Sequence, residues 1–208
     1  MKPTISSNLR WLVYNHLLIK YLEYLNFMRA ANYVIAQVFS LEEVKEINKL
    51  IKENEIDLGK DKAAKFSIKT SKVIATKLGK LKGKLKNFIK FTLLANEKYF
   101  GFDLFPVNDD LMVKHNSYEI GSEYSWHIDA DTASKTRDLK LTSLINCSET
   151  SYEGGDLFVF NRGIEFKAEE FRKPGSVIVL PSFYNHKVTK LTSGNRMTVG
   201  VYFPGSKV

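Results

Sequence analysis

From Leu111 to the C-terminus, short apolar segments alternate with turn residues, and this pattern limits the fold more than any other feature. Glycine, proline and serine punctuate the pattern, for example at Gly154-Gly155, Pro174-Gly175 and Ser193-Gly194. The segments have the length and the β-branched or aromatic content of strands, and they span residues 111–118, 123–129, 139–146, 155–160, 163–167, 176–180, 185–190 and 195–203. Many short strands at this spacing predict a sandwich or barrel, so the fold class is α+β and mainly β.

The first half of the chain carries helical patterns instead. Apolar residues recur at helical spacing over residues 8–30, and we expect residues 1–31 to form a helical extension of a domain that spans residues 32–208. Residues 32–39 predict a strand. Ser40 then begins a helix, since Glu43 stands three residues further on and completes a capping box. The apolar stripe of this helix comprises Val44, Ile47, Leu50 and Ile51.

Two further elements are expected before residue 111. Residues 67–75 predict a strand, between a lysine-rich stretch and the turn residues Gly79 and Gly83. Residues 84–98 have helical periodicity. The side chains that this periodicity predicts to face inward are Leu85, Phe88, Ile89, Leu93 and Leu94.

Positive charge is concentrated in one stretch of the chain. The net charge is +8, and eleven lysines stand between Lys60 and Lys90 against a single acid, Asp61. A local basic block can meet a polyanion such as a nucleic acid. The block lacks the interleaved aromatic residues of a single-strand binding surface. A solvated lysine-rich face is therefore favoured over a nucleic-acid site.

The cysteine content and the hydropathy pattern indicate the compartment. One cysteine, Cys147, excludes an intrachain disulfide and favours a reducing environment. No apolar run reaches the length of a membrane span. The apolar stretch from Trp11 to Leu25 is interrupted by polar and charged residues, which is not typical of a signal peptide. We therefore expect a cytoplasmic protein.

A possible metal site follows from three side chains. His127 and Asp129 are two residues apart in a predicted strand, so both side chains can point to the same face. His186 would supply a second imidazole. Two histidines and one carboxylate occupy one face of an octahedron and leave the remaining positions open. This is the ligand set of a non-haem Fe(II) oxygenase, which must hold a co-substrate and O₂ together.

Five motifs surround these residues. They are Tyr118-x-x-Gly121-x-x-Tyr124-x-x-His127-x-Asp129, Arg137-x-Leu139, Tyr152-Glu153-Gly154-Gly155-Asp156-Leu157, Pro174-Gly175, and Pro181-Ser182-x-x-x-His186-x-Val188-x-x-x-Thr192-x-Gly194-x-Arg196-x-Thr198. In this order they resemble the catalytic core of the Fe(II)/2-oxoglutarate-dependent dioxygenases, specifically the prolyl 4-hydroxylase-like group that includes the PKHD-type hydroxylases. The resemblance covers residues 111–203, thins over residues 32–110 and is absent from residues 1–31.

The resemblance implies a fold, cofactors and residue roles. The implied fold is a double-stranded β-helix, or jelly roll, with helices that back one sheet. The implied cofactors are Fe(II), 2-oxoglutarate as co-substrate and O₂, with ascorbate as reductant. Fe(II) would be bound by His127, Asp129 and His186. The distal carboxylate of 2-oxoglutarate would be held by Arg196, with Thr198 and Tyr118 also in reach of the co-substrate.

The substrate is specified less sharply. By the resemblance, Tyr124 and Arg137 match positions that touch the substrate in prolyl hydroxylases. Trp126 is open to two interpretations, as a residue of the pocket mouth or of the core. Tyr202 replaces the tryptophan usual in prolyl 4-hydroxylases and Arg196 replaces their lysine, which favours the PKHD-type or broader bacterial and phage branch. A protein, peptide or small molecule could be hydroxylated, at a prolyl or other amino-acid residue. Neither the substrate nor the oligomeric state follows from these residues.

Three alternative functions stay open. An AlkB-like oxidative demethylase would act on nucleic acid through the lysine block, but such enzymes tend to carry a second arginine six residues after the first, where this chain has Tyr202. A non-catalytic jelly-roll binding module would have kept the metal site by descent, against which the complete ligand set and Arg196 argue. A cupin-like metal isomerase would not need an arginine at that spacing.

Overall fold

The computed structural model describes residues 32–56, 68–81, 83–130 and 136–207. The predicted extension over residues 1–31 and the first part of the lysine block lie outside these ranges. Within them, no helix combines the length and the apolar character needed to cross a bilayer.

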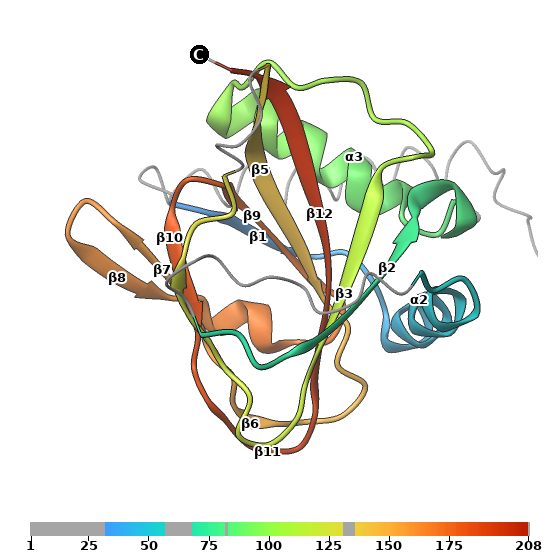
Figure 1. The fold of residues 1–208 in the computed structure, drawn as a ribbon, viewed down its shortest axis with the longest axis vertical. Coiled ribbons are helices and arrows are strands. Elements are labelled where there is room, and N and C mark those ends of the chain that lie inside the picture. Colours follow the sequence, from blue (N-terminus) through green and yellow to red (C-terminus); the bar gives the residue numbers. More distant parts are fainter. Residues whose placement is uncertain (1–31, 57–67, 82, 131–135, 208) are drawn as a thin grey trace, which may run out of the picture. The chain divides into compact units, whose positions relative to one another are not determined.

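Two antiparallel sheets face each other, and a small third sheet closes one end (Figure 1). The larger sheet has the order β1-β9-β5-β12-β3-β2, and its strands are β1 (Val34–Gln37), β9 (Ser176–Pro181), β5 (Arg137–Asn146), β12 (Arg196–Ser206), β3 (Met112–Tyr118) and β2 (Lys72–Lys77). The smaller sheet has the order β4-β10-β7-β8, and its strands are β4 (Tyr124–His127), β10 (Asn185–Val188), β7 (Leu157–Asn161) and β8 (Ile164–Lys167). The third sheet pairs β11 (Leu191–Ser193) with β6 (Glu153–Gly154). The prediction of a mainly β fold is confirmed.

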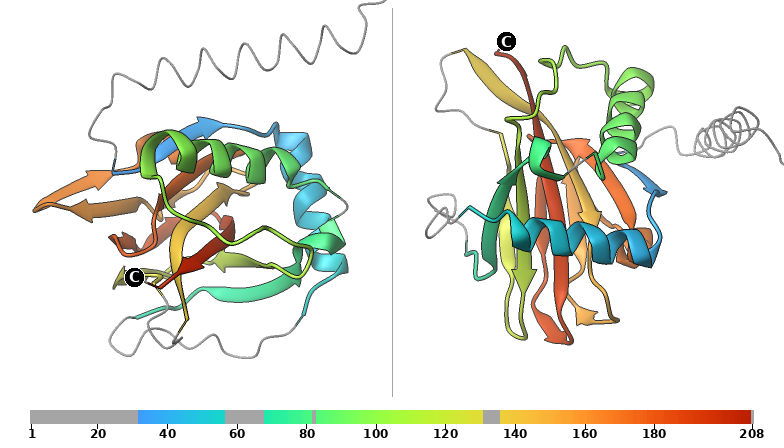
Figure 2. Two further views of the ribbon diagram at one scale, coloured as in Figure 1. Left: turned by 90° about the horizontal axis from the view of Figure 1, so that it is seen from above. Right: turned by 90° about the vertical axis from the view of Figure 1, so that its right-hand side faces the viewer.

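Both faces of the larger sheet are covered. Its inner face meets the smaller sheet, and an apolar cluster that includes Leu144, Leu180, Val159 and Phe171 lies between them. Its outer face lies under helices α2 (Leu41–Glu53) and α3 (Lys86–Ala95), as the right-hand view of Figure 2 shows. The predicted helices that back one sheet are therefore present.

Helix α2 begins where the sequence places it. The Ser40 side chain accepts a hydrogen bond from the Glu43 backbone N–H, and the Glu43 carboxylate accepts one from the Ser40 N–H at 2.8 Å. Val44 and Ile47 are buried as expected. Leu50 is only half-buried, and Asn48 takes a buried position instead because its amide donates to the carbonyl of Cys147 at 2.9 Å. This bond ties the helix to the sheet.

Helix α3 is rotated relative to the prediction. Phe88 is buried as expected, but Leu93 is 40% exposed, and Phe91 and Ala95 face the core. A buried hydrogen bond of 2.8 Å joins Thr92 to Ser143 of β5 and fixes this rotation. The expectation that Leu93 faces inward is wrong. Apolar residues occur on more than one side of this helix, so their spacing does not define a single buried face.

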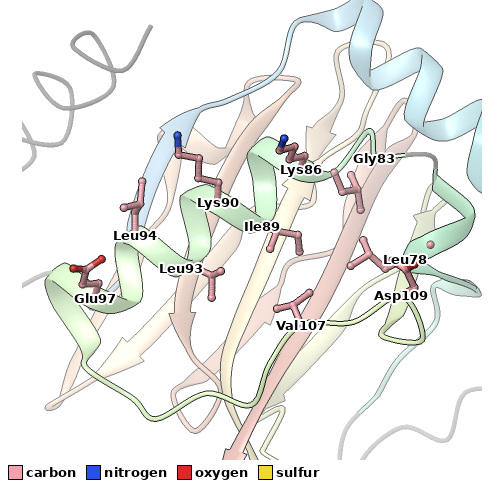
Figure 3. Close-up of a pocket in the computed structure, with 12 residues that line it drawn as sticks. Leu78, Gly83, Lys86, Ile89, Lys90, Leu93, Leu94, Glu97, Val107 and Asp109 are labelled. Carbon is pink, nitrogen blue, oxygen red and sulfur yellow. The ribbon is translucent and has the colours of Figure 1, made fainter. Parts of the chain in front are cut away.

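The outward leucine lines a groove beside α3. The groove has a volume of about 680 Å³, and Figure 3 shows Ile89, Leu93 and Val107 on its walls. It is remote from His127, Asp129, His186 and Arg196, none of which lines it.

Short helical turns complete the described structure. They are the 3₁₀ turns Leu78–Leu81 and Glu169–Arg172 and a π-helical turn, Asn96–Phe100, that follows α3 directly. The π-turn ends at Gly101, whose φ of 68° is left-handed and suits glycine. Strands β6 and β11 were not predicted, because each has only two or three residues.

Candidate metal centre

Three predicted ligands meet at the edge of the smaller sheet. His127 of β4 and His186 of β10 are direct partners in the antiparallel register, and their ring centroids are 4.1 Å apart. Nε2 of His186 is 3.2 Å from Oδ2 of Asp129, and Nε2 of His127 is 3.7 Å from Oδ1. Their ligand atoms all lie within 4.8 Å of one another. This is the one such cluster among the described residues.

Asp129 reaches the centre by a route that differs from the prediction. Strand β4 ends at His127, so Asp129 is not on the strand. The backbone N–H groups of Asp129 and Ala130 instead donate to the carbonyl of Ser182, at 2.8 and 3.1 Å. The segment before β10 therefore anchors the segment after β4, and both arrive at the same point.

Backbone carbonyls orient both imidazoles. Nδ1 of His127 lies 2.8 Å from the carbonyl oxygen of Ser125, and Nδ1 of His186 lies 3.0 Å from that of Tyr184. A carbonyl only accepts, so each Nδ1 carries the proton. The other nitrogen of each ring, Nε2, faces Asp129 and is the atom that would bind a metal ion held between these side chains.

Two hydroxyl groups fix the carboxylate. Thr142 of β5 donates to Oδ2 of Asp129 at 2.8 Å, and its oxygen is 3.0 Å from the hydroxyl of Ser182. Thr142 and Ser182 are both fully buried. Neither residue is predicted from the sequence as part of the site. Ser182 stands in the Pro-Ser-x-x-x-His motif, while nothing in the sequence distinguishes Thr142 from the other threonines.

The electrostatics of the cluster reflect burial and close contact. Burial lowers the pKa of His127 to about 4, and the neighbouring His186 adds to this effect. Burial also disfavours the charged form of His186, but the Asp129 carboxylate outweighs it and raises the pKa of His186. Burial opposes the ionisation of Asp129, yet the two histidines and Thr142 lower its pKa to about 2. The carboxylate is therefore ionised at neutral pH and can bind a cation.

Arg196 is the largest fully buried side chain among the described residues, and its charged group lacks a complete set of hydrogen-bond partners. It begins β12 on the inner face of the larger sheet and is 1% exposed. Its Cζ lies 4.9 Å from the ring centre of Tyr118, but Nε and Nη1 have no hydrogen-bond partner among the described residues. A guanidinium cannot lose its proton, so unpaired buried donors are costly. An anion such as a carboxylate would satisfy them.

The arrangement around Arg196 agrees with the predicted positions of its neighbours. Tyr118 is its direct partner in the register of β3 and β12, and burial raises the pKa of the phenol. Thr198 lies two residues further along β12 on the same face and is buried. Gly155 comes close from the other side, since a Cβ there would stand 2.8 Å from Cδ of Arg196. The glycine therefore makes room for the arginine.

The three tentative substrate residues occupy different places. The ring of Tyr124 stacks on His127 with centroids 3.4 Å apart, so it borders the centre. Trp126 is adjacent to His127 on the strand and points to the opposite face, where it packs edge-on against Phe160. Arg137 is exposed at the first position of β5, opposite Ser206.

The residues fit the predicted metal and co-substrate chemically. Two imidazoles and an ionised carboxylate converge from one side, which suits Fe(II) and leaves coordination positions open. The incompletely paired guanidinium of Arg196 lies on the wall of the space between the sheets. It can hold one end of a dicarboxylate whose other end reaches the metal.

Comparison with known proteins identifies the family of the chain. Residues 113–204 match the family model described as the 2OG-Fe(II) oxygenase superfamily. A PKHD-type hydroxylase of Prochlorococcus marinus is 32% identical over 173 residues, which cover 80% of this chain and 75% of that protein.

Solved structures have the same fold. A prolyl-4-hydroxylase of Pseudomonas putida superimposes with a TM-score of 0.63 at 18% identity, and the match covers 84% of this chain and 92% of that one. A viral collagen prolyl hydroxylase from Paramecium Bursaria Chlorella virus-1 gives a TM-score of 0.61 at 18% identity and covers 84% and 97% of the two chains. The jelly-roll core predicted from the resemblance is thereby confirmed.

Proposed function

We propose that this chain binds Fe(II) through His127, Asp129 and His186. The chain belongs to the PKHD-type hydroxylases of the 2OG-Fe(II) oxygenase superfamily and is a hydroxylating dioxygenase. Arg196 binds the distal carboxylate of 2-oxoglutarate. The observation that carries these roles is the convergence of a metal-binding triad with a buried arginine whose Nε and Nη1 have no partner.

The protein's own residues position and pre-organise the reactants. Carbonyl groups hold each histidine in the tautomer that ligates, and Thr142 holds the Asp129 carboxylate. Thr198 and Tyr118 flank the co-substrate beside Arg196. Bound iron supplies the activation of O₂ that 2-oxoglutarate drives. One oxygen atom enters a C–H bond as hydroxyl and the other enters succinate, with CO₂ released.

The substrate belongs to the same proposal. A prolyl or other amino-acid residue is the favoured target, because the relative is a PKHD-type hydroxylase and two structural neighbours are prolyl hydroxylases by name. Tyr124 lies against His127 and is the residue of the three that best fits contact with this substrate. Ascorbate keeps the iron reduced. The reaction takes place in a reducing cytoplasm, as the single buried cysteine Cys147 favours.

The test is succinate formation from 2-oxoglutarate with Fe(II) and ascorbate under air. We expect slow turnover in the wild type without added substrate. His127→Ala should abolish this turnover. Arg196→Ala should lose it at ordinary 2-oxoglutarate concentrations and regain part of it only at high 2-oxoglutarate. Lys45→Met, on the exposed face of α2, serves as the matched control and should behave as wild type. Absence of both turnover and 2-oxoglutarate binding to the anaerobic Fe(II) protein would contradict the proposal and favour a binding module.

A further inference from the structure

Arg172, the last residue of the 3₁₀ turn before β9, holds one short segment of the chain through its guanidinium. Nη1 donates to the carbonyl of Gly154 at 3.0 Å and to Oδ1 of Asp156, and Nη2 donates to the carbonyl of Tyr152. The Cζ atom of Arg172 also lies 4.6 Å from the ring centre of Tyr152. A guanidinium carries its donors in a rigid planar fork, so one side chain fixes three alternate residues of this segment.

The segment that Arg172 holds contains a turn that local preference does not determine. Gly154 and Gly155 have left-handed φ angles of 68° and 59°. Glycine adopts left-handed and right-handed conformations about equally, so two glycines in succession have many alternative shapes. On the far side of the turn, the N–H of Asp156 donates to the Thr189 hydroxyl at 2.9 Å. Contacts with residues distant in the sequence therefore determine the shape of the turn.

The glycine turn forms one wall of the space around Arg196. A Cβ at Gly155 would stand 2.8 Å from Cδ of Arg196 and 3.0 Å from Cδ1 of Leu191. A Cβ at Gly154 would stand 2.2 Å from the carbonyl oxygen of Lys190. The backbone of the turn therefore packs directly against the arginine side chain, and a change in the turn changes the space in which the guanidinium lies.

A second wall of this space belongs to the same 3₁₀ turn as Arg172. The ring centre of Phe171 is 6.0 Å from Cζ of Arg196. The carbonyl groups of Phe171 and Arg172 each accept a hydrogen bond of 2.9 Å from the side-chain amide of Asn146. Asn146 is fully buried on β5 and is the direct partner of Thr198 on β12. The 3₁₀ turn is thus fixed to the larger sheet, and Arg172 extends this support to the glycine turn.

The charge of Arg172 already has a partner in the Asp156 carboxylate. The other oxygen of that carboxylate, Oδ2, lies 3.4 Å from Nζ of Lys167, which also pairs with Glu169 at 2.8 Å. Loss of Lys167 would therefore remove a positive charge beside the turn but none of the hydrogen bonds that Arg172 donates to it. This difference makes Lys167 the matched control for Arg172.

We propose that Arg172 is a positioning residue for 2-oxoglutarate: it holds the Gly154-Gly155 turn against Arg196 and so keeps the guanidinium in the orientation that binds the distal carboxylate. This inference rests on the proposed function and adds a residue to the co-substrate site. Because hydrogen bonds to a carboxylate depend on direction, a guanidinium that shifts in its compartment loses affinity even though its charge is kept.

The experiment measures two affinities and the steady-state constants for each variant. Calorimetric titration of the anaerobic Fe(II) protein gives Kd for 2-oxoglutarate, equilibrium dialysis gives Kd for Fe(II), and succinate formation without added substrate gives kcat and KM for 2-oxoglutarate. The variants are Arg172→Met, the conservative Arg172→Lys, and Lys167→Met as control. A lysine at position 172 can keep the ion pair with Asp156 but has no planar fork to span the backbone carbonyls.

We expect Arg172→Met to raise Kd and KM for 2-oxoglutarate about tenfold, with kcat at saturation and Kd for Fe(II) within about twofold of the wild type. Arg172→Lys should lie between the wild type and Arg172→Met, and Lys167→Met should match the wild type. A role in stability alone would lower the affinity for Fe(II) and for 2-oxoglutarate together.

An unchanged Kd for 2-oxoglutarate in Arg172→Met, or a parallel loss of Fe(II) affinity, would overturn this inference and leave the proposed function intact. If Arg172→Met does not fold, Arg172→Lys decides by the same two affinities. Absence of 2-oxoglutarate binding and turnover in the wild type would instead reject the proposed function.

Discussion

The two faces of the larger sheet bury polar groups in opposite ways. On the outer face, under α2, the imidazole of His115 is 3% exposed and its Nε2 has no partner among the described residues. On the inner face, Arg196 is 1% exposed and also has unpaired nitrogens. Burial, helped by the charge of Lys52, lowers the pKa of His115 to about 4, so this side chain is neutral.

The difference lies in whether the buried group can lose its charge. A buried histidine can lose its proton and become neutral. The neutral ring then has one unpaired nitrogen acceptor, which costs little free energy in the core. An arginine stays charged at any physiological pH and needs an anion. Burial of a polar side chain is therefore no sign of function by itself. Burial of a permanent charge with unsatisfied donors indicates a ligand, which is why the inner face carries the site.

The largest effect should come from the apolar packing of the outer face. Phe88→Ala should lower the free energy of unfolding by about 3–5 kcal/mol, because Phe88 is fully buried and leaves a cavity. Leu93→Ala on the same helix is the control and should change it by less than about 0.5 kcal/mol. Denaturant unfolding measures both. Equal costs for the two variants would contradict the observed rotation of α3.

Arg196→Met tests the inner face directly. Removal of the charged partner should weaken 2-oxoglutarate binding about 30-fold or more, the equivalent of about 2 kcal/mol or more. Stability without ligand should be unchanged or higher, because two unpaired donors leave the core. Calorimetric titration of the anaerobic Fe(II) protein and thermal unfolding with and without 2-oxoglutarate check both effects. A marked loss of stability without ligand would show that the arginine is structural.

His115→Leu tests the outer face through pH. The pKa of His115 is near 4 when folded and 6.5 when unfolded, so the unfolded chain takes up a proton first as pH falls. Stability should therefore decline between about pH 6.5 and pH 4, by about 3 kcal/mol in total, and level off below. The difference between wild-type and His115→Leu unfolding curves isolates this contribution. A difference that does not vary with pH would show that His115 keeps its ordinary pKa.

The last prediction concerns the residues that support the ligands. Thr142→Val keeps the shape of the side chain and removes the hydrogen bond to Asp129. Partners of metal ligands typically contribute 10–100-fold to metal affinity, and we expect a loss of that order. Equilibrium dialysis with Fe(II) under anaerobic conditions measures it. Thr92→Val, whose hydroxyl bonds Ser143 on the outer face, is the control and should leave metal affinity unchanged.

Sequence patterns predicted the helices and strands that are determined by residues close together in the chain. The capping box at Ser40 and the strand segments from residue 111 onward depend on neighbours in the chain, and the structure contains them. The rotation of α3 depends on a hydrogen bond between Thr92 and Ser143, which are 51 residues apart. No periodicity within the helix can reveal such a bond. The prediction failed at Leu93 for that reason.

The sequence by itself determined which side chains are candidates to bind the metal and the co-substrate, because the chemistry of iron and of a carboxylate limits the residue types and their spacing. The tertiary structure alone decided how these side chains are held. Asp129 leaves strand β4 and is anchored by Ser182 and Thr142, which come from other parts of the chain. It also decided that Tyr118 and Arg196 lie side by side on the inner face, since only strand pairing brings β3 and β12 together.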